Sequence, residues 1–77
     1  MARLPRLSGK DVIEIFRRDG WTVDRIEGSH HILVKPGHEA TLSVPVHGRQ
    51  EIKLGLLKRL IRDAGMTNMR FTDLAQR

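Results

Sequence analysis

The side chains best suited to proton transfer in this chain are its four histidines, His30, His31, His38 and His47. Histidine is the side chain whose ordinary pKa lies closest to neutral pH, so it can act as a general base or a general acid. Two of the four, His30 and His31, follow directly after Gly28-Ser29, a turn signal between β-prone stretches. Their position makes this pair the first candidates for chemistry.

A histidine base can remove the proton from a ribose 2′-hydroxyl, so that the freed oxygen attacks the adjacent phosphate. A nearby Lys or Arg then stabilises the negative charge that gathers on the phosphoryl oxygens. This chemistry requires no metal ion. A histidine at the start of a strand is more often structural than catalytic, so position alone leaves both interpretations of His30 open.

Other kinds of site fit the sequence poorly. The spacing of the histidines matches no zinc signature, and the chain has no cysteine to complete one. Ser29 precedes His30, but neighbouring residues of a strand point to opposite faces, so we expect Ser29 to stabilise the turn. There is no glycine-rich phosphate loop either. We therefore expect no metal site and no small-molecule cofactor.

The chain is strongly basic, with 14 Lys and Arg against 9 Asp and Glu and a formal net charge of +5 on 77 residues. Such a charge attracts polyanions, and nucleic acid is the first partner to consider, although a basic surface that only maintains solubility explains the charge equally well. Two groups of cations are candidates for phosphate contacts: Arg49 and Lys53 beside the polar loop 47–51, and Lys58, Arg59 and Arg62 on one helix face. For the helical group, a solvated surface is the alternative.

The elements that must position these residues begin with a helix over 8–19. Ser8 is a good N-cap with Asp11 as its capping-box partner, and Gly20 ends the helix. Three β-prone stretches follow: one that begins at Trp21 and ends at the Gly28 turn, then 30–35 and 41–46. Pro45 predicts that the third is an edge strand or ends there.

A second helix is predicted by an apolar stripe at helical spacing, Leu56, Leu57, Leu60, Ile61 and Ala64. Gly65 caps its end. Thr67 can cap a last short helix, whose expected anchors are Met69 and Leu74.

These elements predict a single α+β domain over 1–77, of α-β-β-β-α order, with a three-stranded antiparallel sheet, helices packed on one face and an optional short C-terminal helix. Alternation in 30–35 favours Ile32 and Val34 as the inward pair, which turns His30 toward the helices and His31 toward solvent. No apolar run is long enough for a signal-peptide core or a membrane span, so we expect a cytoplasmic protein.

Three segments together resemble the HicA (YcfA-like) toxin family in sequence, order and spacing: Gly28-Ser29-His30-His31-Ile32, Val44-Pro45-Val46-His47-Gly48 and Ile52-Lys53-Leu54-Gly55-Leu56-Leu57. The first helix and Gly20-Trp21 are similar as well. The resemblance therefore runs over nearly the whole chain, from Leu7 to Gly65.

This resemblance implies a double-stranded-RNA-binding-domain-like fold, cleavage of mRNA, and a HicB-like antitoxin that covers the active site. The family's catalytic histidine follows Gly-Ser and corresponds to His30 here, with His31 in reserve. Ser29 and His47 are candidate supporting residues, and His47 is equally suited to anchoring its loop.

The sequence thus predicts an mRNA-cleaving toxin of a type II toxin–antitoxin system, a metal-independent endoribonuclease with His30 as its general base. Two alternatives remain open at this stage. One is a non-catalytic RNA-binding module, which the basic helix faces explain equally well, and the other is a protein whose remaining role is to dock an antitoxin.

Overall fold

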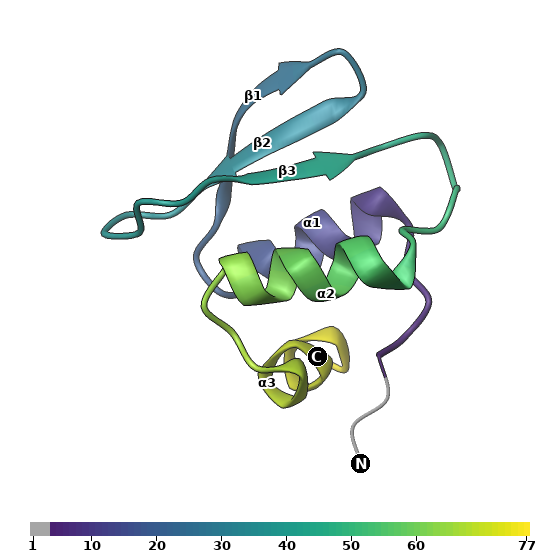
Figure 1. The fold of residues 1–77 in the computed structure, drawn as a ribbon, viewed down its shortest axis with the longest axis vertical. Helices are drawn as coiled ribbons and strands as arrows, with labels where there is room; N and C mark the ends of the chain where they lie inside the picture. The colour runs from purple at the N-terminus through teal and green to yellow at the C-terminus, as the bar shows by residue number, and fades with distance from the viewer. Residues whose placement is uncertain (1–3) are drawn as a thin grey trace.

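The computed structural model describes residues 4–77, so residues 1–3 of the expected 1–77 domain lie outside the described part. Along the chain it has the elements α1 (Gly9–Arg17), β1 (Thr22–Glu27), β2 (His30–Val34), β3 (Leu42–Pro45), α2 (Leu54–Asp63) and α3 (Asn68–Ala75). The predicted α+β class and α-β-β-β-α order are confirmed, and the optional helix is α3 (Figure 1).

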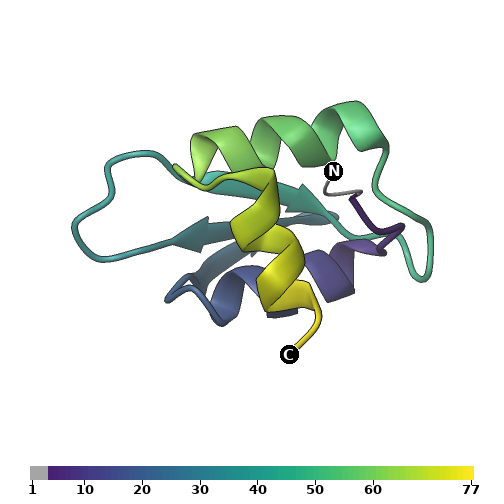
Figure 2. The same ribbon diagram turned by 90° about the horizontal axis from the view of Figure 1, so that it is seen from below.

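The three strands form an antiparallel sheet in the order β1-β2-β3, with β2 in the centre. Helices α1 and α2 lie beneath one face of this sheet, and α3 crosses below them on the side away from the strands (Figures 1 and 2). β3 is an edge strand and ends at Pro45, as the proline predicted. Within residues 4–77, no helix is long and apolar enough to cross a membrane.

Local signals in the sequence account for the ends of the helices. Ser8 caps α1 through the predicted capping box, in which Ser8 and Asp11 each accept a hydrogen bond from the other's backbone N–H at 3.3 Å. Thr67 caps α3 by accepting from the Arg70 N–H at 3.0 Å. Gly65 follows the end of α2 with a φ of 71°, the left-handed conformation that favours glycine there.

The core lies between the sheet and the helices and continues down to α3. Phe16 of α1 is fully buried, with its ring centroid 5.4 Å from that of Phe71 in α3 and 6.4 Å from that of Trp21. Leu74 is buried, as predicted for an anchor of this helix. The prediction that Met69 is the second anchor is wrong, because its side chain is 73% exposed. Phe71 and Leu74, three residues apart, share the buried side of the helix, and Met69 lies on its outer side.

The expected orientation of β2 is also wrong. His31 pairs with Val44 and Leu33 pairs with Leu42, and directly paired residues point to the same face of a sheet. Leu33, Leu42 and Val44 are fully buried in the helix-side core. His31 and Leu33 therefore face the helices, and His30 lies on the opposite face of the sheet. His30 is next to Pro45 at the end of the edge strand β3, and at that edge it lines a depression together with residues of α2.

The prediction failed because β2 is apolar on both faces. Ile32 is only 7% exposed although it points away from the helices and lies outside the helix-side cluster. A central strand with apolar residues on both faces has no alternation from which its inward face can be predicted.

Candidate functional site

His30 lines a depression of about 340 Å³ between the edge strand β3 and helix α2. In the sheet register His30 pairs with Pro45, so the histidine lies next to the end of β3. The same depression is lined from α2 by Leu56, Arg59 and Asp63. The structure therefore brings the predicted base together with one of the predicted phosphate-binding cations.

A second depression, of about 170 Å³, adjoins the first and shares Pro45 and Leu56 with it. Its lining includes His47 and Lys53, two further candidates from the sequence. We call the two depressions together the β3–α2 groove. Four residues predicted on separate segments, His30, His47, Lys53 and Arg59, thus line one groove.

The two cations of the groove differ in their environments. The guanidinium Nε of Arg59 lies 4.0 Å from a carboxylate oxygen of Asp63, whose carboxylate is also 3.7 Å from Arg62. Because the Arg59 side chain is 70% exposed, this ion pair is weak, and an incoming phosphate can compete with it. Lys53, the residue at the N-cap position of α2, forms no ion pair with any carboxylate of residues 4–77.

The turn before β2 determines where His30 lies. Gly28 has a φ of 60°, a conformation that glycine adopts without strain. The Ser29 carbonyl accepts a hydrogen bond of 2.8 Å from the Val46 N–H, which ties this turn to the end of β3. The contribution of Ser29 seen here is through its backbone.

His31 has a different environment from His30. Its side chain is half-buried on the helix side of β2, and its Nδ1 is buried without a hydrogen-bond partner among residues 4–77. An unpaired buried nitrogen is destabilising, so it is an unusual feature of this strand. His31 does not line the β3–α2 groove.

His38 has a structural role. Its ring packs edge-on against Trp21 with centroids 4.9 Å apart, and its Nε2 donates a hydrogen bond of 2.9 Å to the Asp63 carbonyl at the end of α2. Within residues 4–77, no three His, Asp or Glu side chains come together as a metal-binding group. The four histidines therefore do not converge on one point.

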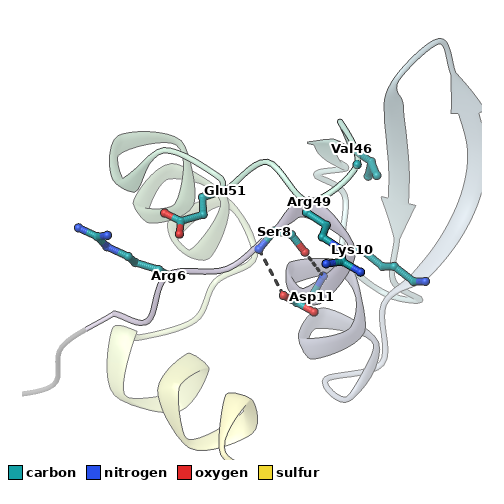
Figure 3. A pocket seen from close by; sticks show the side chains of 8 residues that line it. Arg6, Ser8, Lys10, Asp11, Val46, Arg49 and Glu51 are labelled. Carbon is teal, nitrogen blue, oxygen red and sulfur yellow. Dashed lines mark hydrogen bonds between the residues drawn. The ribbon is translucent and has the colours of Figure 1, made fainter.

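The remaining predicted cations lie outside the groove. Lys58 and Arg62 are exposed on α2 and line neither depression. Arg49 lines a separate cleft of about 640 Å³ beside the N-terminus of α1, together with Arg6 and Lys10 (Figure 3). Arg6 and Lys10 are not among the phosphate contacts predicted from the sequence, because they are far from Arg49 along the chain and line the same cleft only in the fold.

Fold and groove together define a class: a small basic α+β protein of α-β-β-β-α order, with histidine and basic side chains in a surface groove. Residues 9–66 match the family model described as the HicA toxin of bacterial toxin–antitoxin, so the chain belongs to the HicA toxin family. It is accordingly a toxin of a toxin–antitoxin system. No curated protein matches the chain.

Proposed function

We propose that this toxin is a metal-independent endoribonuclease that cleaves mRNA in the β3–α2 groove, with His30 as its general base. The observation that carries the proposal is the presence of His30 and Arg59 in one exposed groove. A proton acceptor and a cation in the same groove are the two groups that attack by a 2′-hydroxyl on the adjacent phosphate requires.

In the proposed mechanism, His30 removes the proton of the 2′-hydroxyl, and the resulting oxygen attacks the neighbouring phosphorus. The bond to the 5′-oxygen of the next nucleotide breaks, that oxygen takes up a proton from water, and His30 returns its proton to solvent. Arg59 stabilises the charge on the phosphoryl oxygens, while Lys53 and His47 bind the strand farther along the groove. The product strand carries a 2′,3′-cyclic phosphate or its hydrolysed form.

His31 is the second candidate for the base, because of its unpaired buried Nδ1. It points toward the helices rather than into the groove. For RNA to reach it, the strand would have to enter on the helix side of the sheet. The exposed position of His30 avoids this requirement.

The partners that follow from the proposal are mRNA and a HicB-like antitoxin that covers the groove. The proposed location is the cytoplasm, which follows from mRNA as the substrate. The cations on the outer side of α2, Lys58 and Arg62, would contact the RNA backbone without sequence preference.

The test is induction of the chain alone, with growth and bulk mRNA integrity compared for the parent, His30→Ala and His31→Ala at matched protein levels. The proposal requires that the parent arrests growth and cuts mRNA, that His30→Ala does neither while remaining folded, and that His31→Ala retains cleavage. Fragments should end in 2′,3′-cyclic phosphate and should form equally well in EDTA.

Three other results would contradict parts of this proposal. Equal behaviour of the parent and His30→Ala would favour the RNA-binding module or the antitoxin-docking protein. Loss of cleavage in His31→Ala alone would transfer the role of base to His31. Fragments with 5′-phosphate and 3′-hydroxyl ends would exclude attack by the 2′-hydroxyl.

A further inference from the structure

The cleft beside α1, of about 640 Å³, is a concave region that the proposed mechanism does not use. We call it the α1 cleft. Its cations come from three segments: Arg6 from the residues before α1, Lys10 from the first turn of α1, and Arg49 from the loop after β3 (Figure 3).

These three cations are not engaged elsewhere in the fold. Within residues 4–77, Arg6, Lys10 and Arg49 form no ion pair and no side-chain hydrogen bond. Most other basic side chains have an acidic or carbonyl partner: Arg18, Arg25, Lys35, Arg59, Arg62, Arg70 and Arg77.

Two acidic residues, Asp11 and Glu51, also line the α1 cleft, so its three cations and two carboxylates leave a net charge of +1. The Asp11 carboxylate accepts the Ser8 N–H and thereby caps α1, while Glu51 is exposed. The Asp11 N–H at the start of α1 already donates to the Ser8 hydroxyl. The Asp11 N–H is therefore not free to bind an anion, whereas the side chains of the three cations are.

The α1 cleft and the β3–α2 groove lie on two sides of the same loop. Val46, Gly48 and Arg49 line the cleft, His47 and Gln50 line the groove, and Glu51 lines both. A strand that passes from His30 along the groove to His47 therefore needs only to cross residues 46–51 to reach Arg49 and Lys10.

We infer that Lys10, Arg49 and Arg6 contact successive phosphates of the RNA strand at nucleotides beyond the cleaved bond and so form a second phosphate subsite. Figure 3 shows Arg6 directed away from Lys10 and Arg49, so the three cations cannot all meet one phosphate. The inference rests on the proposed function, since it extends the path of the same RNA strand. Phosphate contacts away from the reacting atoms position a strand without taking part in the chemical step. The subsite accordingly determines how tightly a long RNA binds, whereas the groove determines how fast it is cut.

The test combines binding and cleavage with the double variant Lys10→Gln/Arg49→Gln. The control is Arg17→Gln, which removes one exposed cation at the opposite end of α1. Binding of a single-stranded RNA of about ten nucleotides, a typical site size for such proteins, is measured against salt concentration in a His30→Ala background. Cleavage of the same RNA and of a dinucleotide is measured with His30 intact.

We expect the double variant to reduce the slope of log K against log salt by about 0.7 for each phosphate that the protein no longer neutralises. Its KM for the long RNA should rise severalfold with kcat unchanged, and its cleavage of the dinucleotide should equal that of the parent. The inference is overturned if the salt slope and KM change no more than in Arg17→Gln, or if the dinucleotide is affected as strongly as the long RNA.

If the proposed endoribonuclease activity is wrong, these experiments give a result that differs from failure of the α1-cleft inference. A parent chain that cuts neither RNA would contradict the endoribonuclease, while the binding measurement in the His30→Ala background would still decide whether the α1 cleft holds phosphate. Lys10 and Arg49 are both exposed, so their substitution should leave the unfolding midpoint near that of the parent.

Discussion

Arg59 and Lys58 are neighbours on α2 with the same charge, but only Arg59 lines the depression that contains His30. A cation stabilises a transition state only where charge develops, whereas any surface cation attracts RNA over a longer range. The two residues therefore offer a matched comparison between catalytic and general electrostatic effects.

We expect Arg59→Gln to lower kcat by about tenfold or more. The loss should be smaller than the roughly 10²–10³-fold that follows removal of a preorganised oxyanion donor, because Arg59 is largely exposed. Lys58→Gln should weaken RNA binding slightly and leave kcat unchanged. Steady-state cleavage of a defined RNA by both variants measures this difference. Equal kcat values for the two would remove Arg59 from the proposed mechanism and leave Lys53 as the remaining cation of the groove.

The packing of α1 against β3 depends on a glycine. A Cβ added at Gly9 would lie closer to the Pro45 carbonyl oxygen than real side chains approach a backbone atom. Pro45 is shared by both parts of the β3–α2 groove. The close packing of α1 on the end of β3 therefore supports the groove.

Gly9→Ala should accordingly lower the free energy of unfolding by about 1–3 kcal/mol, the usual cost of overpacking. Gly55→Ala is the matched control, because a Cβ at Gly55 meets nothing within 4 Å and alanine favours the helix by up to about 1 kcal/mol. Denaturant unfolding of both variants measures the contrast. If Gly9→Ala were as stable as Gly55→Ala, the close approach of α1 to Pro45 would not be needed for stability.

In the molecule as a whole, α3 closes the lower side of the core. The family match ends at residue 66, but Phe71 and Leu74 beyond it are almost completely buried. Arg18, which follows α1, also donates a hydrogen bond of 2.7 Å to the Leu74 carbonyl. In a chain of this size a single aromatic side chain is a large part of the core.

Phe71→Ala should therefore destabilise the protein by about 3–5 kcal/mol, a large share of the roughly 5–15 kcal/mol that typical domains possess. Met69→Ala on the exposed side of the same helix should change stability by less than about 0.5 kcal/mol. The shift in denaturant midpoint at constant m-value measures both effects. A destabilisation by Phe71→Ala no larger than that by Met69→Ala would show that α3 is not part of the cooperative fold.

Residue type and spacing alone were enough to predict the local features of this protein. Ser8, Asp11, Thr67 and Gly65 act on neighbouring residues, so the helix ends follow from short stretches of sequence. The resemblance carried by the three segments around His30, His47 and Lys53 was sufficient to predict the family.

Features that depend on residues far apart in the chain followed from the packing of the elements instead. The inward face of β2 is set by its pairing with β3, because a strand that is apolar on both sides carries no alternation. Phe71 anchors α3 because its ring packs against Phe16 of α1. His30 and Arg59 line the same depression, and Arg49 and Lys10 line the same cleft, only because β3 packs beside α2 and next to α1. Sequence periodicity describes one element at a time and does not predict this.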